Sequence, residues 1–323
     1  MKEPSINTRA TRETLLARLF AGLSVARCIA VLGVLLVAGT ARAQSIDPRS
    51  YSNAPIGIDF LLSGVVRSNG GVPSDPALPL TDPKLEVWSG FVGFAHVFEL
   101  AGQSGNWALI VPYSYLSGDA NYLGQHVTRE QSGGGDILAR VTVNLIGAPA
   151  LNPKEFASYR QDLIVGASLA VSAPTGAYDD ANLVNIGANR WMIKSELGAS
   201  KAVGDWILET SGAVTIFTNN DAFSGGHVRE QDPIYSLQLH AIYTFRPGLW
   251  VSGSVTYYNG GRTTVDGVLA DNLQDNWRAG ATLSVPLTRA QSVKLSGSNG
   301  VSARTGNNFS LLALSWQLLW DAW

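Results

Sequence analysis

His240 and two nearby serines are the residues whose types could support nucleophilic catalysis. His240 stands near Ser236 in the stretch IYSLQLHAIYTF, and Ser252 follows in the next stretch, LWVSGSVTYY. A serine nucleophile needs a base within hydrogen-bond reach, and one face of a sheet could hold all three side chains. The chain has no GxSxG motif to strengthen this arrangement. We therefore interpret His240 as a histidine bonded to polar groups inside the protein, and we do not predict an enzyme.

A near-repeat of His and Glu raises the question of a metal site. HVTREQ at His126–Gln131 is followed by HVREQ at His227–Gln231, each in a predicted external loop. Two His and two Glu could converge on a metal, whereas exposed charge pairs commonly form salt bridges. Asp179 and Asp180 could meet a divalent cation that bridges lipopolysaccharide phosphates, but their spacing lacks a defined metal-loop pattern. We predict no metal ligands and no cofactor, and we assign the repeat no role.

Alternation of apolar and polar residues predicts the elements that carry these side chains. In residues 234–245 and 249–258, one parity is apolar throughout, and the other carries the polar residues, among them Ser236, His240 and Ser252. Successive side chains of a β-strand point to opposite faces, so this period of two is typical of strands and not of helices. The RPG turn between the two stretches predicts a hairpin.

Twelve candidate strands follow from this pattern along the chain. The predicted strands are 56–66, 85–98, 106–116, 136–147, 161–172, 190–203, 205–218, 234–246, 248–259, 275–287, 291–299 and 308–320. Longer and shorter breaks alternate between them, apart from a long break at 148–160 where a turn is expected. This pattern is typical of an all-β fold, a transmembrane antiparallel β-barrel of the outer-membrane type with about 12 strands, whose closure pairs every backbone group in lipid. A soluble β-sandwich is the alternative, and it would not require the asymmetry of the loops.

Charged residues on the polar parity are candidates for lining the lumen of this barrel. They are Arg140, Asp162, Lys194, Glu196, Glu209, His240, Arg278 and Lys294. Opposite charges can pair across or along the wall, so they form no ring of a single sign and predict no ion selectivity. The alternative to a role in lining a solute pathway is that these charges only stabilise a closed barrel interior. A lumen of this strand number is wider than that of an eight-stranded barrel and narrower than that of general porins.

The N-terminal part has the composition of a secretory signal peptide. Basic residues precede the apolar run CIAVLGVLLVAGT, and the small-residue sequence ARA ends at Ala43. The apolar run is shorter than the roughly 20 residues that cross a bilayer as a helix. We therefore predict export to the cell outer membrane, with 1–43 as a cleaved signal peptide, 44–55 as a periplasmic N-terminal segment and 56–323 as the barrel. Entry of residues 44–55 into the lumen is the alternative.

Removal of residues 1–43 changes the chemistry of the remaining chain. It discards the single cysteine, Cys28, so neither disulfides nor cysteine-bound metals can stabilise residues 44–323. It also removes six of the 23 basic and two of the 25 acidic residues, which leaves a net charge of −6. An acidic chain without a basic cluster is a poor candidate for nucleic-acid binding, and we expect no such partner.

One external loop and an aromatic belt are expected at the membrane boundaries. The stretch APTGAYDDANLVNIGANRW, residues 173–191, combines Pro and Gly, which disfavour a central strand, with Asn residues that can close Asx-type turns. We interpret it as an external loop that re-enters the membrane at its final tryptophan. Tryptophans near strand starts predict an interfacial belt, and they are Trp107, Trp191, Trp206, Trp250 and Trp277.

Three stretches carry a resemblance to a known family. They are PTGAYDDANLVNIGANRW, GDWILETSGAVTIFTNND at 204–221 and DPIYSLQLHAIYTFRPGLWVSGSVTYYNGG at 232–261. The sequence resembles the outer-membrane proteins named for the meta-cleavage pathway of phenol degradation, over most of residues 44–323. The resemblance implies a transporter or channel, and the family name implies passage of aromatic compounds. It names no catalytic residue.

Three classes of function are compatible with this sequence. We expect an outer-membrane channel or transporter that passes small solutes, aromatic or otherwise hydrophobic. The alternative is a structural or adhesion protein whose loops contact lipopolysaccharide or a partner, and the third class is a barrel enzyme. The partners that we expect are outer-membrane lipid and lipopolysaccharide, small-molecule solutes and the barrel-assembly machinery, which reads an aromatic residue at the end of the last strand.

Overall fold

The computed structural model describes residues 46–70, 80–182, 184–305 and 309–321. These residues belong to the second of two compact units in the chain, Val37–Trp323. The predicted signal peptide, residues 1–43, and the terminal aromatic Trp323 lie outside the described residues. Within the described part of the chain, no helix is long and apolar enough to cross a membrane.

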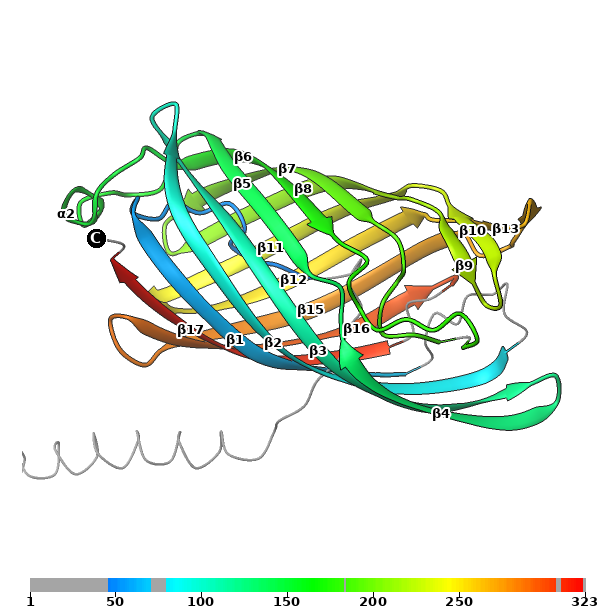
Figure 1. Cartoon of the computed structure of the whole chain (residues 1–323). Coiled ribbons are helices and arrows are strands. Elements are labelled where there is room, and N and C mark those ends of the chain that lie inside the picture. The colour runs from blue at the N-terminus through cyan, green and yellow to red at the C-terminus, as the bar shows by residue number, and fades with distance from the viewer. Residues whose placement is uncertain (1–45, 71–79, 183, 306–308, 322–323) are drawn as a thin grey trace, which may run out of the picture. The chain divides into compact units, whose positions relative to one another are not determined.

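A closed ring of twelve antiparallel strands forms the barrel (Figure 1). Each strand of the ring pairs with the next, and β1 pairs with β17 to complete the circle. The strands are β1 (Ile58–Gly70), β2 (Leu80–Leu100), β3 (Gln103–Tyr122), β5 (Leu138–Ile146), β6 (Leu163–Ser172), β7 (Met192–Val203), β8 (Trp206–Phe217), β11 (Ile234–Arg246), β12 (Leu249–Gly260), β15 (Gln274–Pro286), β16 (Gln291–Ala303) and β17 (Phe309–Asp321). The predicted fold class and strand number are confirmed. We call the end with the turns at 101–102, 204–205 and 247–248 the short-turn end, and the opposite end the long-loop end.

Five further strands lie at the long-loop end, where the sequence predicted loops. They are β4 (Gln125–Gly134), β9 (Asn220–Phe223), β10 (His227–Gln231), β13 (Thr263–Val265) and β14 (Val268–Leu269). β4 extends β3 as a hairpin, and the other four form a separate sheet. Asp266 and Gly267 join β13 to β14 with φ values of 48° and 78°, the left-handed conformation that a tight type I′ hairpin requires. The HVTREQ and HVREQ repeats therefore lie on β4 and β10, in two different hairpins.

The long connection at 148–160 contains one short helix, α2 (Pro153–Phe156). Asn152 caps it, because its Oδ1 accepts hydrogen bonds from the N–H groups of Lys154 at 3.0 Å and Glu155 at 3.1 Å. The Glu155 carboxylate accepts the N–H of Asn152 in return, at 3.0 Å. This reciprocal capping box, with Pro153 in the first turn, explains why a helix starts at this point.

Side chains alternate between the lumen and the outer face of the barrel as the parity predicts. On β11, Gln238 and His240 are buried inside, whereas Leu237 and Leu239 are exposed on the outer face. Four of the five tryptophans expected in the interfacial belt are exposed. Trp250 is the exception, since it is only 4% exposed. It shares its parity with Ser252 on β12 and points into the lumen, so its assignment to the belt is wrong.

The loop at 173–191 is organised around a buried carboxylate. Asp136 Oδ1 accepts the N–H of Gly176 at 2.9 Å, and its Oδ2 accepts the N–H of Ala188 at 3.1 Å. Within the loop, Asp179 Oδ1 accepts the N–H of Ala181 at 3.1 Å, which is the expected Asx-type turn. The stretch is an external loop fixed to the start of β5.

Candidate functional site: the barrel lumen

The N-terminal segment, which we define as residues 46–57, crosses the lumen before β1 begins. Ile46 lies against Gly280 of β15, where a Cβ atom would come within 2.8 Å of the Ile46 Cδ1. Farther along, the Arg49 guanidinium lies 5.8 Å from the centre of the Trp250 ring on β12. The sequence predicted a periplasmic segment at 44–55, with entry into the lumen as the alternative. The described residues of the segment take the alternative and lie in the lumen.

Tyr51 fixes the segment to β6 and β7 and is fully buried. Its ring covers Gly166 and Gly198, which are directly paired across the two strands. A Cβ at Gly198 would lie 2.0 Å from the Tyr51 Cε2, and one at Gly166 would lie 2.6 Å from its Cδ1. The Tyr51 hydroxyl donates a hydrogen bond to Glu196 Oε1 at 3.0 Å. The two glycines leave a flat surface that any side chain would remove.

Hydrogen bonds hold the segment on both sides of Tyr51. The N–H of Ser50 donates to Glu209 Oε1 at 3.1 Å. Asn53 donates from Nδ2 to the carbonyl of Pro149 at 3.1 Å and accepts from the hydroxyl of Ser104 at 2.7 Å. The segment is therefore attached to several strands of the barrel and to the connection after β5.

Three of the predicted lumen residues form one charged cluster. Lys194 Nζ lies 2.7 Å from Glu196 Oε2, and the Arg140 guanidinium lies 3.7 Å from Glu196 Oε1. Asp47 of the N-terminal segment joins them at 3.9 Å from Arg140. Glu196 thus receives two cations and the Tyr51 hydroxyl, which offsets the cost of burying its charge.

Three further predicted lumen residues face the interior separately. His240 Nδ1 lies 2.8 Å from the Ser254 hydroxyl, its cross-strand partner, and not within the expected arrangement with Ser236 or Ser252. Arg278 is fully buried, donates to the Ser298 hydroxyl at 2.9 Å and lies 4.0 Å from the centre of the Phe309 ring. Lys294 Nζ lies 5.9 Å from the centre of the Trp250 ring.

Asp162 does not face the lumen, which corrects its place among the predicted residues. Its side chain is 80% exposed and forms an ion pair with Lys201. β6 begins at Leu163, so Asp162 belongs to the connection before the strand. The predicted strand, 161–172, includes Asp162, but the alternation of side chains applies only to residues within a strand.

A cavity of about 1270 Å³ remains beside the N-terminal segment inside the lumen. Its lining extends from the turn residues Pro247 and Leu287 at the short-turn end to Leu138 and Met192 at the long-loop end. One side, which we call the apolar wall, consists of Phe60, Leu62, Val66, Phe91, Val97 and Ile110 on β1–β3. We call a set of polar residues that face the lumen from β5–β12 the polar wall, and its members are Arg140, Lys194, Glu196, Glu209, Gln238, His240, Ser252 and Ser254.

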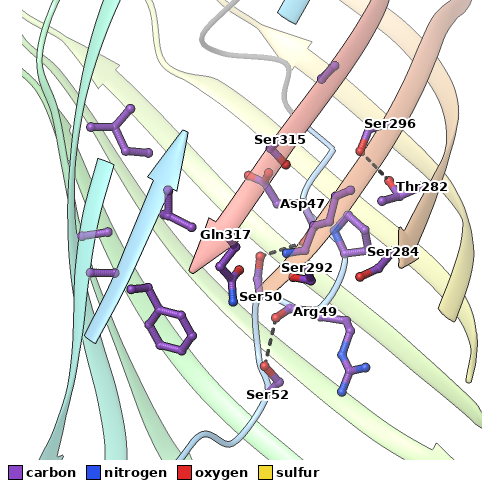
Figure 2. Close-up of a pocket in the computed structure, with 18 of the residues that line it drawn as sticks. Asp47, Arg49, Ser50, Ser52, Thr282, Ser284, Ser292, Ser296, Ser315 and Gln317 are labelled. Carbon is purple, nitrogen blue, oxygen red and sulfur yellow. Dashed lines mark hydrogen bonds between the residues drawn. The ribbon is translucent and has the colours of Figure 1, made fainter. Parts of the chain in front are cut away.

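Hydroxyl groups line a third part of the cavity. Figure 2 shows Arg49 and Ser50 of the N-terminal segment across from Ser284 and Ser292 of β15 and β16. Thr282 donates to the Ser296 hydroxyl at 3.1 Å, so part of this row is bonded within itself. A solute in the cavity would meet an apolar surface and hydrogen-bonding groups at the same time.

Sequence reasoning left entry of the N-terminal segment into the lumen as an alternative, and it missed the contacts of that segment and the apolar wall. Residues 46–57 have no periodicity, so no signal places Arg49 or Tyr51 in the lumen. The apolar wall does leave a signal, because alternation fails on β2 and β3. There Phe91 faces the lumen and Val92 the outer face, and Ile110 and Val111 do the same.

The separate sheet of β9, β10, β13 and β14, which we call the outer sheet, contains a contact between a His and an Asp side chain. His227 Nδ1 contacts Asp266 Oδ2, and Asp266 Oδ1 accepts the N–H of Val228 at 2.8 Å. The backbone N–H of Val228, and then the His227 side chain, hold the pKa of Asp266 below its usual value. Among the residues that the structure describes, no group of three or more His, Cys, Asp or Glu side chains could hold a metal ion.

Comparisons with known proteins identify the fold and the family. The COG4313 outer membrane channel from Pseudomonas putida F1 has a TM-score of 0.73 at 22% identity, with 85% of this chain and 100% of that chain covered. The translocator domain of the autotransporter NalP from Neisseria meningitidis has a TM-score of 0.49 at 9% identity, covering 84% of this chain and 91% of that chain. No curated protein matches. The family model described as "Putative MetA-pathway of phenol degradation" matches residues 67–318 and confirms the resemblance seen in the sequence. The chain belongs to this family.

Proposed function

We propose that this protein is an outer-membrane channel for the passive passage of small solutes that are aromatic or otherwise hydrophobic. The observation that carries the proposal is the cavity of about 1270 Å³, which runs along the apolar wall between the two ends of a closed barrel. Pockets that bind small molecules have volumes of several hundred to about a thousand cubic ångströms and are mostly apolar. The family description and the named channel of the same fold agree with this function.

The apolar wall supports hydrophobic solutes in preference to sugars or ions. Six apolar side chains on three adjacent strands would face water if the lumen served only hydrophilic solutes. Apolar surface gains roughly 25 cal/mol for each Å² that a solute removes from water. A small aromatic ring would therefore bind along this wall, whereas a sugar would leave its apolar surface in contact with water.

We propose no catalytic role for the lumen. His240 and Ser254 form a buried pair on the polar wall, and the Ser254 hydroxyl is its hydrogen-bond partner at 2.8 Å. Nucleophilic catalysis also needs a group that orients the base and donors for the developing oxyanion. Replacement of His240 with Ala would change no lipid profile in this reading, and an altered profile would revive the enzyme alternative.

We further propose that residues 1–43 are cleaved on export and that outer-membrane lipid, lipopolysaccharide and the barrel-assembly machinery are partners. Exposed apolar side chains on the outer face, among them Val92, Tyr113 and Leu197, support contact with lipid. N-terminal sequencing of the protein from outer membranes tests the cleavage, and a start at Gln44 is the expected result.

Single-channel recording in a planar lipid bilayer tests the proposed function. Steady currents are expected, and micromolar to millimolar toluene should reduce them in steps as it occupies the cavity, at concentrations where glucose has no effect. Glucose is the matched hydrophilic solute. Currents that toluene leaves unchanged would contradict the proposal, and they would favour the structural or adhesion alternative.

A further inference from the structure

The cavity has an excess of cationic side chains that the proposed function does not explain. Its charged lining consists of Arg49, Arg140, Arg246, Arg289 and Lys294 against Asp47 and Asp136. Asp136 is bound by two backbone N–H groups of the external loop. Asp47 lies beside Arg140, whose other carboxylate neighbour is Glu196. Both carboxylates of the lining therefore already have partners, Asp136 in the external loop and Asp47 at Arg140.

Arg49 and Lys294 are the two cations of this lining that share one aromatic ring. Both lie within 6 Å of the Trp250 centre, at 5.8 Å and 5.9 Å. Among the described residues, no carboxylate oxygen lies within 4.0 Å of the charged nitrogens of either side chain. Glu209 faces Arg49 and Asp47 faces Lys294 only at longer range. Glu209 Oε1 also accepts the N–H of Ser50.

The surroundings of this pair match an amphipathic anion. Trp250 is buried beneath the two cations, and Phe60 and Phe91 of the apolar wall line the same cavity. A carboxylate gains most from hydrogen bonds to cations where water is partly excluded, and an attached ring gains from apolar surface. Arg246 and Arg289, at the turns of the short-turn end, extend the positive charge to that mouth of the cavity.

We propose that the lumen contains a binding site for organic anions of the aromatic carboxylate class, with the carboxylate between Lys294 and Arg49 and the ring on the apolar wall. The proposal rests on the proposed function, because it names the class of solute that the channel favours. Neutral aromatic solutes enter the same cavity without the contribution of the two cations.

A matched pair of solutes tests this site in the purified full-length protein. Benzoate and benzamide have the same ring and nearly the same size, and only benzoate carries a charge. In a planar bilayer at neutral pH, benzoate should block the current at a concentration about tenfold lower than benzamide, as expected for one hydrogen bond to a charged group. Lys294→Met should abolish this difference, and Lys294→Arg should retain it. Lys201→Met is the control, because Lys201 pairs with Asp162 outside the lumen.

Each outcome separates this site from the channel function. Equal block by benzoate and benzamide, or a preference that survives Lys294→Met, would overturn the anion site and leave the channel for apolar solutes intact. If neither aromatic solute blocks the current, the proposed function itself fails. Heat-modifiable migration in gels verifies that each variant has folded as a barrel.

Discussion

The two walls of the lumen differ in what they contact. The polar wall is covered by the N-terminal segment, which bonds to Glu196 through Tyr51 and to Glu209 through Ser50. The segment meets the apolar wall on β1–β3 where it enters β1, since the N–H of Gly57 donates to the carbonyl of Val97, and the six apolar side chains of this wall border the cavity. Buried polar groups need partners and apolar groups do not, so the segment satisfies one wall and leaves the other to a solute. The segment therefore narrows the lumen without filling it.

Gly198→Val should displace the N-terminal segment from the polar wall, which is the largest effect that we expect. Its side chain would occupy the place of the Tyr51 ring, since a Cβ alone would lie 2.0 Å from the ring. We expect the segment to leave the polar wall and the single-channel conductance to rise. Gly212→Val is the matched control, because a Cβ at Gly212 meets nothing within 4 Å. An unchanged conductance in Gly198→Val would show that the segment does not limit the channel.

Two substitutions of Tyr51 should separate the contributions of its ring and its hydroxyl to docking of the N-terminal segment. Tyr51→Ala removes a fully buried ring and should destabilise docking of the segment by about 3–5 kcal/mol, whereas Tyr51→Phe loses one charge-assisted hydrogen bond, about 1.5–3 kcal/mol. Residues 44–323 contain no cysteine, so a Ser52→Cys thiol reports exposure of the segment. Its labelling rate should rise more in Tyr51→Ala than in Tyr51→Phe. Equal rates in both variants would contradict this division.

Phe91→Asn should weaken solute binding at the apolar wall. Loss of a phenyl ring that lines the cavity should weaken block by toluene about tenfold, from roughly 1.5–3 kcal/mol of lost apolar contact. Labelling of Ser52→Cys should not change, because the described segment is held by bonds to Glu196, Glu209 and Pro149 and not by Phe91. Ser296→Ala, on the hydroxyl-lined side, is the control and should leave toluene block as it is. A Phe91→Asn variant with normal block would mean that apolar solutes use another path.

Acidification should produce the smallest effect, confined to the outer sheet. The pKa of Asp266 is lowered in the folded protein, so its contacts with Val228 and His227 contribute stability at neutral pH. That contribution is lost as the pH falls through the lowered pKa, below the usual range of an aspartate. Proteolysis of β10 and β13 should therefore increase at low pH, and Asp266→Asn should show less of this pH dependence. A change in toluene block over the same pH range would contradict the separation of sheet and lumen.

The sequence predicts the barrel well where the lumen is polar. Residues 234–245 alternate clearly, because Gln238 and His240 face the polar interior while Leu237 and Leu239 face outward. On β1–β3 the alternation is weak, because both faces are apolar. The strands on which apolar and polar residues fail to alternate are thus the ones that form the apolar wall, where we propose that the solute binds.

Other features depend on contacts that no local pattern records. The surface under Tyr51 requires Gly166 and Gly198, which are distant in sequence and meet only through the pairing of β6 and β7. Trp250 has the parity of the lumen, but the expectation of interfacial tryptophans outweighed that signal. The strands β4 and β10 stand at the long-loop end, where polar side chains on both faces remove the apolar parity that predicts a strand.

Locking the N-terminal segment in place tests whether solutes pass along the apolar wall. Asn144 Nδ2 lies 3.5 Å from the carbonyl of Ser52, so thiols in a Ser52→Cys and Asn144→Cys variant can be joined by a short bifunctional reagent. Toluene block of the single-channel current is then measured before and after cross-linking. Because the cavity lies along the apolar wall, toluene should block the current equally before and after the segment is locked. Loss of block after cross-linking would contradict it, since the solute would then require the place that the segment occupies.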